Sequence, residues 1–483
     1  MLISKVFEVN KDADVLNIMQ DSRKKAENAI FFASKGKIND GHRFIDKAIE
    51  NGAIVIVHSD PVENKKEDVV YLQMDNVEFA FARFCNAFYG YPTNILNTIG
   101  ITGTNGKTTI AWIIRSIIAR FNKCGYIGTM GYCYDENLLN SKLNLTTPKS
   151  DELFRIAKEM IDNGCKTLVL EASSEGLYTH RLDDVNFTTA VFNNLSQDHM
   201  DVHGNMESYF ESKLLLFRML KEDSVSIVNV DDEYAGRAIE ASKCNIRTYG
   251  IEKECDYRAV NITMHADYTE FDLVYNGKTY PIKTNMIARF NVYNLLAVIA
   301  VLNENGYKIE SILPYLENIE LTPGRCQLVK AGQNFNAVID FAFTQNSFNK
   351  VFDYANSITS KDKKIIAVFG AAGDRDHTRR PLTSAVADQR ADQVILTYDD
   401  PSSEDMMTIL KEMETYFTRI KPEIILDRYE AVKKAVNDAE DGDTILVLGK
   451  GSDHFIIDKD GRIPWMSDEE AIKTAIKEKY ISK

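Results

Sequence analysis

Residues 97–121 read NTIGITGTNGKTTIAWIIRSIIARF, and this stretch decides the fold. An apolar, β-branched run is followed by a glycine-rich turn and then by a pattern typical of a helix. A turn of this kind points successive backbone N–H groups at a phosphate, and the dipole of the following helix adds to the field. The stretch therefore predicts a strand, a phosphate-binding loop and a helix, which together suit ATP.

The loop residues have separate expected roles. Lys107 is expected to reach the terminal phosphates, and the Thr108 hydroxyl is expected to hold Mg²⁺. The spacing departs from the usual P-loop, because Ile101 stands where the first glycine is expected and Gly100 comes one residue early. The predicted nucleotide-binding residues of the loop are Gly103, Thr104, Asn105, Gly106, Lys107, Thr108 and Thr109.

Short apolar runs alternate with longer amphipathic segments along the whole chain. They lie near residues 53, 97, 167, 189, 224, 364, 393 and 444. This alternation favours parallel α/β sheets. Turn-rich seams at 89–94 and 321–325, the second after a helix-like stretch from about 291 to 318, predict three domains at 1–96, 97–325 and 326–483. The expected class is α/β: a central parallel sheet with helices on both faces, a Rossmann-like C-terminal domain and a smaller N-terminal domain.

Charge and cysteine content limit the function. The chain has 57 Lys and Arg against 71 Asp and Glu, a formal charge of -14, which repels nucleic acid and anionic membranes. Seven scattered cysteines with no Cys-x-x-Cys pair indicate neither a disulfide framework nor a zinc site. No stretch approaches 18 uncharged apolar residues. We expect a cytoplasmic protein that binds neither nucleic acid nor membrane.

Acidic and imidazole side chains follow two predicted strands. Glu171 ends the strand TLVLE, and Asp198 and His199 lie in a polar turn after the strand TAVFNN. Such groups at the ends of strands suit a magnesium ion bound by oxygen ligands and phosphate. The segment 209–217 then reads as an amphipathic helix whose Lys213 faces the same site.

The strings GTNGKTT at 103–109 and NLSQDHMDVHG at 194–204 resemble those of the Mur ligase and folylpolyglutamate synthetase superfamily. The resemblance implies that Thr108, Glu171, His199 and Lys213 bind magnesium, and that Lys213 carries a carbamate. A carbamate converts a cation into an anion that can orient a second metal ion. Lys107, Lys213 and His199 are thus the candidate catalytic residues, with ATP, Mg²⁺ and a carbamylated Lys213 as the cofactor set.

Further matches to this family lie in the second half of the chain. By resemblance, Asn291 contacts adenine, Arg325 in Pro-Gly-Arg helps to bind nucleotide, and Asp340 belongs to the same site. Phe343 stands where the family usually has a histidine, so polar contacts there must be fewer or supplied from elsewhere. Arg375, in a Gly-Asp-Arg-Asp string, is a candidate substrate-binding residue.

The N-terminal stretch, with Asp21-Ser22-Arg23 and Asp40-Gly41-His42, resembles the uridine-diphosphate-binding domain of the MurE branch, and Ser22 is the candidate ligand there. The resemblance also implies a site for the muramoyl dipeptide. Glu175 replaces a usual histidine in that site. Its candidate residues are Thr146, Thr147, Ser174 and Arg181.

Specificity for the added amino acid is expected at a strand-end motif and a glycine-rich turn. Diaminopimelate enzymes of the branch read Asp-Asn-Pro-Arg, whereas this chain has Ser402 in place of the arginine, and serine cannot pair with a distal carboxylate. The acidic surroundings favour lysine, or ornithine, over diaminopimelate. Ser452 and Asp453 also replace the family's histidine and glutamate. The candidate residues are Asp399, Asp400, Ser402, Gly449 and Asp453.

The resemblance, which covers about residues 20–460, implies an ATP-dependent ligase of peptidoglycan synthesis. Its expected substrates are the UDP-N-acetylmuramoyl dipeptide and a free amino acid, joined through an acyl phosphate, and a monomer is expected. Two alternatives stay open. One is a related ligase recruited to another acyl acceptor or amino acid, and the other is a non-catalytic nucleotide-binding scaffold.

Overall fold

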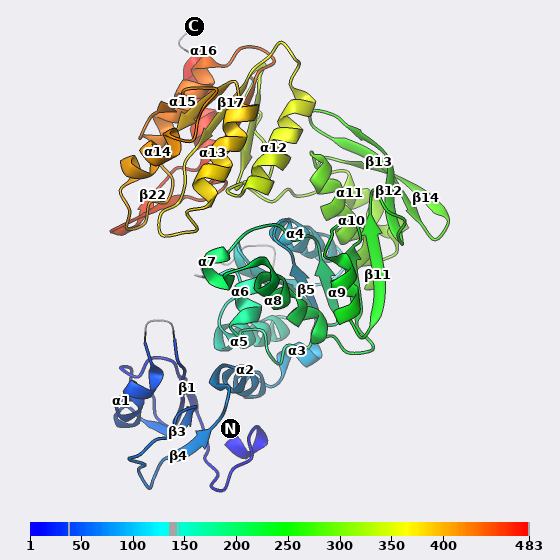
Figure 1. Cartoon of the computed structure of the whole chain (residues 1–483). Helices are drawn as coiled ribbons and strands as arrows, with labels where there is room; N and C mark the ends of the chain where they lie inside the picture. The colour runs from blue at the N-terminus through cyan, green and yellow to red at the C-terminus, as the bar shows by residue number, and fades with distance from the viewer. Residues whose placement is uncertain (37–38, 135–142, 144, 482–483) are drawn as a thin grey trace.

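The computed structural model describes residues 1–483 except 37–38, 135–142, 144 and 482–483. Three main sheets follow one another along the chain, and Figure 1 shows them as three lobes, blue at the N-terminus, green in the middle and yellow to red at the C-terminus. The boundaries predicted at 96 and 325 fall between sheets.

The first sheet is small and entirely parallel, in the order β1-β2-β3-β4. Side chains alternate between its two faces: Ile30 and Val55 pack against α2, and Phe31 and Ile56 pack on the side of α1. Both faces are therefore buried, which explains the continuous apolar runs in β2 and β3. The elements are η1 (Ile3–Lys5), β1 (Asn17–Met19), β2 (Ala29–Ala33), η2 (Gly41–Phe44), α1 (Ile45–Glu50), β3 (Ala53–His58), β4 (Val70–Gln73), α2 (Val77–Phe88) and α3 (Pro92–Ile95).

The central sheet has ten strands in the order β14-β13-β12-β11-β10-β9-β5-β8-β6-β7. Strand β5 lies between β8 and β9, so the chain leaves it where the strand order reverses, which is where open α/β sheets bind ligands. The strands are β5 (Asn97–Thr102), β6 (Cys124–Gly128), β7 (Gly131–Cys133), β8 (Thr167–Glu171), β9 (Thr189–Phe192), β10 (Val225–Asn229), β11 (Asn245–Gly250), β12 (Tyr257–Met264), β13 (Thr269–Tyr275) and β14 (Lys278–Thr284).

Helices cover both faces of this sheet. Helices α4 and α10 contribute to one apolar core, and α5 and α8 contribute to the other. The helices are α4 (Lys107–Ile118), α5 (Ser150–Asp162), α6 (Ser174–Tyr178), α7 (Met200–His203), α8 (Met206–Arg218), α9 (Ala235–Ala241), α10 (Arg289–Glu304) and α11 (Ile309–Leu316).

Two features differ from the sequence-based expectation. Strands β12, β13 and β14 extend the parallel sheet by an antiparallel meander, which the strand–helix alternation does not reveal. The helix-like stretch from about 291 to 318 is two helices, because Gly306 adopts a left-handed φ of 89° between α10 and α11.

The C-terminal sheet has the order β15-β16-β20-β17-β18-β19, with a separate hairpin of β21 and β22. Its parallel strands are β16 (Asn336–Asp340), β17 (Ile365–Phe369), β18 (Gln393–Leu396), β19 (Glu423–Ile424) and β20 (Thr444–Leu448), and β15 (Gln327–Leu328) joins β16 antiparallel. The remaining elements are α12 (Gln345–Ile358), α13 (Arg379–Arg390), α14 (Met406–Glu414), α15 (Arg428–Asp438), β21 (Phe455–Asp458), β22 (Gly461–Pro464) and α16 (Asp468–Ile481).

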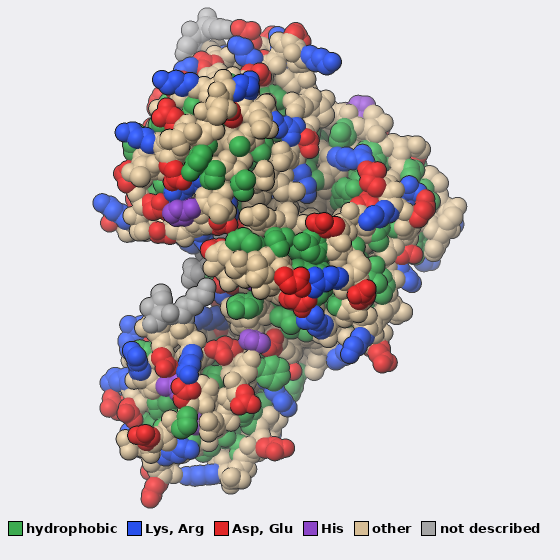
Figure 2. Space-filling model, viewed as in Figure 1, with side chains coloured by type: hydrophobic (Ala, Val, Ile, Leu, Met, Phe, Trp, Pro, Cys, Tyr) green, Lys and Arg blue, Asp and Glu red, His purple; other side chains and the backbone are tan. Residues whose placement is uncertain are grey.

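Figure 2 shows the surface hollowed between the C-terminal lobe and the rest of the chain. Residues of the central and C-terminal domains together line a cavity of about 480 Å³. Within the described residues, the helices are all too short or too polar to cross a membrane.

Candidate active site

The phosphate loop joins β5 to α4. Gly106 has a left-handed φ of 89° and caps α4, whose first residue is Lys107. A Cβ atom at Gly106 would overlap the Asn193 and Asn294 side-chain amides. The loop therefore needs glycine both for its backbone conformation and for the close approach of these side chains.

Two lysines converge on one carbonyl of this loop. Lys107 Nζ donates to the Gly103 oxygen at 2.9 Å, and Lys213 Nζ, from α8, donates to the same oxygen at 3.0 Å. Burial lowers the pKa of both amines, and the charge of Lys107 helps to lower the pKa of Lys213 well below its ordinary value. The surroundings therefore favour the neutral form of the Lys213 amine.

A buried carboxylate stands beside these amines. Glu171, fully buried at the end of β8, accepts hydrogen bonds from Thr108 Oγ1 at 2.8 Å, Tyr126 Oη at 2.6 Å and the Thr129 backbone N–H at 3.0 Å. A second hydroxyl, Thr129 Oγ1, lies 3.1 Å from the same carboxylate. Carboxylate and hydroxyl oxygens are the ligands that Mg²⁺ prefers, so these residues fit that ion.

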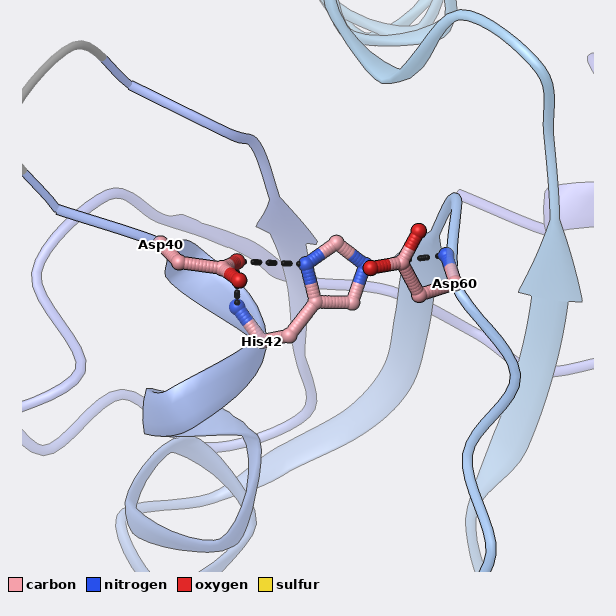
Figure 3. A group of neighbouring side chains, drawn as sticks. All are labelled: Asp40, His42 and Asp60. Carbon is pink, nitrogen blue, oxygen red and sulfur yellow. Dashed lines mark hydrogen bonds and ion pairs between the residues drawn. The ribbon is translucent and has the colours of Figure 1, made fainter.

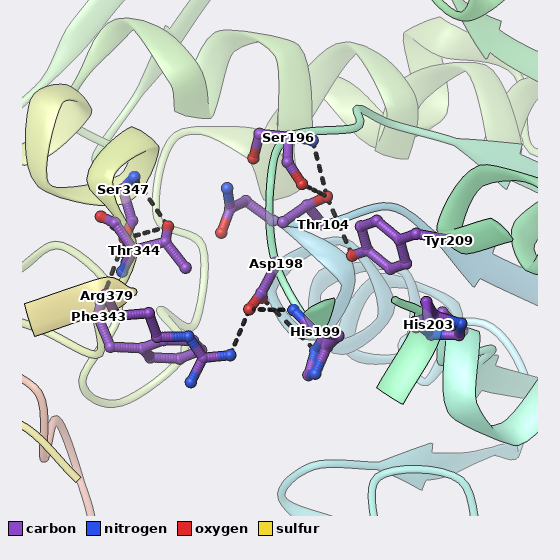
Figure 4. Close-up of polar contacts among 12 residues, drawn as sticks. Thr104, Ser196, Asp198, His199, His203, Tyr209, Phe343, Thr344, Ser347 and Arg379 are labelled. Carbon is purple, nitrogen blue, oxygen red and sulfur yellow. Dashed lines mark hydrogen bonds and ion pairs between the residues drawn. The ribbon is translucent and has the colours of Figure 1, made fainter. Parts of the chain in front are cut away.

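The turn after β9 carries the other predicted metal ligand. His199 has a left-handed φ of 55°, and its backbone N–H donates to Asp198 Oδ1 at 2.8 Å. Burial lowers the pKa of His199. Arg379, from α13 of the C-terminal domain, donates to the same Asp198 oxygen (Figure 4).

His203 lies four residues further on, buried against Tyr209, with its Nε2 atom 3.1 Å from Ser174 Oγ. Burial lowers the pKa of His203 to about 4, so the ring is neutral at pH 7. The imidazole therefore bridges the His199 turn and a residue predicted to bind the dipeptide.

The cavity of about 480 Å³ brings the predicted nucleotide-binding residues together. Asn105, Gly106 and Thr109 reach it from the loop, and Asn291, Arg325 and Asp340 reach it from further along the chain. The Asn291 amide donates to the Ile287 carbonyl at 2.7 Å and accepts from Asn294 at 2.8 Å, so its orientation is fixed. Both Asp340 oxygens accept backbone N–H groups, from Cys326 and Ala342.

Several residues on the wall of the cavity were not predicted. Five of them lie at the ends of β9 and β10, where the polar strings Asn193-Asn194 and Asn229-Val-Asp-Asp232 could have indicated them. Lys350 is different: α12 carries it into the cavity, and burial lowers its pKa although Asp232 opposes the change. The additional residues include Asn193, Asn194, Asn229, Asp231, Asp232 and Lys350.

The residues predicted to bind the dipeptide lie next to Glu171. Thr147 Oγ1 donates to the Glu171 carbonyl oxygen at 2.8 Å, and Thr146 Oγ1 lies 3.1 Å from Thr129 Oγ1. Arg181 Nη2 pairs with Glu175 Oε1 at 2.9 Å. The cation expected to meet an anionic substrate is thus partly neutralised by the residue that replaces the family's histidine.

Ser22 is buried in the N-terminal domain, away from the phosphate loop, and its carbonyl oxygen accepts from Asn51 at 2.7 Å. Nearby, His42 links two loops, as Figure 3 shows. Its Nδ1 atom lies 2.7 Å from Asp40 Oδ1, and its Nε2 atom accepts the Ser59 and Asp60 backbone N–H groups at 3.1 Å. Both nitrogens are occupied, so Asp40, His42 and Asp60 form a structural link rather than a metal site.

The acidic cluster predicted for the amino acid lies at the ends of β18 and β20. The side chain of Lys450 pairs with two of these acids: its Nζ atom is 2.8 Å from Asp400 Oδ1 and 3.3 Å from Asp453 Oδ2. Asp399 lies so close to Gly449 that a Cβ atom there would overlap its carboxylate, and burial raises the pKa of Asp399 to about 6. The cluster therefore carries less negative charge than the sequence suggests.

Ser402 has a left-handed φ of 52° and its N–H donates to Ile457, while Arg375 is exposed in the β17–α13 loop.

The predicted residues thus form three groups. One surrounds the phosphate loop and the cavity, one is the acidic cluster, and Ser22 stands apart in the first domain.

Comparisons with known proteins cover nearly the whole chain. The family model of the Mur ligase middle domain matches residues 101–302, that of the Mur ligase glutamate ligase domain matches 324–451, and that of the Mur ligase family catalytic domain matches 15–89. The chain is 36% identical over 482 residues to the UDP-N-acetylmuramoyl-L-alanyl-D-glutamate–2,6-diaminopimelate ligase of Clostridium tetani, covering 98% of this chain and 97% of that one. The enzyme of the same name from Geobacillus thermodenitrificans is 36% identical, with 96% of each chain covered.

Solved structures agree in fold. A UDP-N-acetylmuramoyl-L-alanyl-D-glutamate–2,6-diaminopimelate ligase is 27% identical, with a TM-score of 0.71 and 99% of each chain covered. MurF ligase from Thermotoga maritima, solved with ADP, is 17% identical with a TM-score of 0.64, over 96% of this chain and 98% of that one. The predicted three-domain α/β architecture is confirmed.

Proposed function

Since this chain belongs to the Mur ligase family, and is a MurE-type ATP-dependent ligase that adds the third residue of the stem peptide, we propose that this residue is a basic amino acid, lysine or ornithine. Its partner substrate is UDP-N-acetylmuramoyl-L-alanyl-D-glutamate. The observation that carries the proposal is Ser402, which stands where a diaminopimelate-binding arginine is expected by resemblance.

The charges around Ser402 support a distal ammonium. Three carboxylates, Asp399, Asp400 and Asp453, lie here; Lys450 pairs with two of them, and the buried Arg428, which is paired with Asp468, acts on Asp399. Asp399, whose pKa burial raises to about 6, is mostly ionised at pH 7 and can accept a hydrogen bond from an ammonium group. A second carboxylate on the incoming amino acid would meet these acids, and Ser402 offers no cation to pair with it.

The reaction proceeds in two steps. The glutamyl carboxylate oxygen of the dipeptide attacks the γ-phosphorus of ATP; an oxygen–phosphorus bond forms, the bond to the bridging oxygen breaks, and ADP leaves. The amine nitrogen then attacks the acyl carbon, the carbon–oxygen bond to phosphate breaks, and the amine loses a proton. Lys107 and the backbone N–H groups at the start of α4 hold the phosphates during the first step.

The chain's own residues set up the charge balance of this site. Thr108, Glu171, His199 and Lys213 would hold magnesium, which would supply positive charge for the transferring phosphoryl group. Glu171 is kept in position by Tyr126 and Thr129, so its carboxylate is oriented in advance. Residues of the C-terminal domain line part of the cavity, and closure of that domain would limit the access of water to a hydrolysable acyl phosphate.

We further propose that Lys213 is carbamylated. Its neutral nitrogen would attack the carbon of dissolved CO₂; a nitrogen–carbon bond forms, one carbon–oxygen π bond opens, and a proton leaves. Only the unprotonated amine has the lone pair for this step, and burial beside Lys107 favours that form.

The test is phosphate release with ATP, Mg²⁺ and the UDP-linked dipeptide, screened against lysine, ornithine, diaminopimelate and neutral amino acids. Turnover with lysine or ornithine and little with diaminopimelate is expected. Preferred turnover of diaminopimelate, the substrate named for the curated relatives, would refute the specificity proposal while leaving the ligase reaction intact.

A second candidate function rests on the Glu175–Arg181 pair. Because this pair withdraws a cation from the dipeptide site, the chain could instead serve another acyl acceptor as a recruited ligase. Absence of turnover with every amino acid, combined with intact ATP binding, would favour this function.

A further inference from the structure

We propose that Arg379 is a positioning residue that holds the His199 turn in place through Asp198, and that Phe343 in turn positions Arg379. The inference rests on the proposed function, since it gives His199 a role at the reacting phosphate. Figure 4 shows the residues in sequence across the junction: Phe343 and Arg379 from the C-terminal domain, Asp198 and His199 from the central one.

The first step is the contact between domains. The side chain of Asp198 is only 4% exposed, and its Oδ1 atom receives both the Arg379 guanidinium and the His199 backbone N–H. A buried carboxylate needs such a partner, because an uncompensated charge there would draw in water. Loss of Arg379 should therefore make the Asp198 carboxylate, which accepts the His199 N–H, more mobile.

The second step is the conformation of His199. A left-handed φ of 55° is unfavourable for a histidine and persists where the surroundings impose it. Asp198 brackets the residue, with one oxygen on the backbone N–H and the other 3.5 Å from the ring Nε2 atom. Because Arg379 pairs with Asp198, the C-terminal domain helps to set the orientation of the His199 imidazole.

The third step is how Arg379 is aimed. Its guanidinium carbon lies 4.8 Å from the centre of the Phe343 ring, which is a cation–π distance. Within the described residues its Nε atom has no hydrogen-bond partner, so the ring face takes the place of a polar anchor. Phe343 itself is held by its N–H bond to Ser347 Oγ at 3.2 Å, next to the capping box of α12.

The Arg379–Asp198 ion pair lies in a region where the two domains make few other polar contacts. Ser196, Gln197, Thr344 and Arg379 line a second cavity of about 210 Å³, so the two domains are not tightly packed at this point. The described polar contacts nearby add only a long one, from Asn105 Nδ2 to Asn346 Oδ1 at 3.4 Å. Arg379 is thus the main polar link beside the His199 turn.

The experiment uses the full-length protein without substrates. Amide hydrogen exchange of residues 196–204 reports the His199 turn, and small-angle scattering reports the closure of the C-terminal lobe. Arg379→Met should speed the exchange and enlarge the radius of gyration. Phe343→Leu should speed the exchange by roughly two- to fivefold, the factor that corresponds to one cation–π contact, and Phe343→Tyr, which keeps a ring, should match the wild type.

The matched control lies in the same helix. Arg390 also pairs with an acid, Asp353, and lies 5.7 Å over Phe352, but all three residues belong to the C-terminal domain. Arg390→Met should therefore leave the exchange of residues 196–204 unchanged.

Two results would overturn the inference: unchanged exchange in Arg379→Met, or an effect of Phe343→Leu that adds fully to that of Arg379→Met. In active enzyme, both variants should raise the KM for ATP more than Arg390→Met does. Failure of the proposed ligase reaction would appear instead as a wild type with normal exchange and no turnover.

Discussion

Lys107 and Lys213 donate to the same oxygen, the Gly103 carbonyl, at 2.9 and 3.0 Å. Two ammonium groups this close would repel one another in a buried site, so at least one of them tends to be neutral. The pKa of Lys213 is lowered further than that of Lys107, so the arrangement favours the neutral, nucleophilic amine at Lys213.

Replacing Lys213 should abolish turnover. Lys213→Met removes the nitrogen on which a carbamate forms, and we expect phosphate release to fall by at least about 100-fold, as on loss of other charge-stabilising groups. A short carboxylate such as formate should restore part of the activity, and Lys213→Arg should respond neither to formate nor to bicarbonate. Full activity of Lys213→Met would exclude the carbamate.

The same substitution should stabilise the folded protein in CO₂-free buffer. With its pKa lowered on folding, Lys213 binds fewer protons in the folded than in the unfolded state, so the wild type loses stability as pH falls from about 10 toward the lowered pKa. Lys213→Met lacks this loss, and its melting temperature should exceed the wild-type value increasingly as pH falls through that window. The exposed Lys221→Met serves as the control; an identical pH profile in wild type and Lys213→Met would contradict the prediction.

Gly106→Ala should destroy nucleotide binding. The added methyl group must displace the Asn193 and Asn294 amides and also adopt a left-handed φ. Titration calorimetry with an ATP analogue should show at least about tenfold weaker binding. Gly236→Ala, in the helix α9 with open space around the new methyl, should bind normally, and equal affinities of the two variants would count against the loop assignment.

Releasing Arg181 should improve the use of the dipeptide. Glu175→Gln removes the carboxylate that pairs with Arg181, so the KM for the UDP-linked dipeptide should fall by about two- to fivefold, as for one partly exposed ion pair. Initial-rate kinetics with varied dipeptide measure this. Glu159→Gln, which breaks the Arg155–Glu159 pair of α5, should leave the KM unchanged, and a raised KM in Glu175→Gln would show that Glu175 itself binds substrate.

Ser402→Arg should shift the amino-acid preference toward diaminopimelate. The guanidinium would supply the bidentate partner for a distal carboxylate that the wild type lacks. The ratio of kcat/KM for diaminopimelate to that for lysine should rise by about tenfold or more, while Ser402→Met, similar in length but uncharged, should leave it unchanged. A similar shift in both variants would mean that length and not charge sets the preference.

The sequence predicted those structural features that depend on a few neighbouring residues. The run 97–121 predicted β5, the loop and α4, because the period of apolar residues and the position of Gly106 are determined by a few neighbouring residues. The apolar runs near 53, 167, 189, 225, 365, 393 and 444 are likewise strands. By contrast, the sequence did not predict the antiparallel strands β12 to β14. Which strands they pair with, and in which direction, depends on the sheet that they extend.

Charge state and pairing were decided by the tertiary structure. The sequence predicted an acidic amino-acid pocket and a dipeptide contact from Arg181, but not that Lys450 pairs with Asp400 and Asp453 or that Glu175 pairs with Arg181. Lys350 carries no local signal at all, because its place in the cavity depends on how α12 faces the central domain.

By itself, then, the sequence determined the family, the phosphate loop and the residue types of the site, because short contiguous motifs are enough to identify them. Only the tertiary structure brought Lys213 onto a carbonyl 110 residues away and Arg379 onto Asp198, 181 residues away. The physical reason is that a pKa and an ion pair depend on burial and on charges within a few ångströms, and folding assembles these from distant parts of the chain.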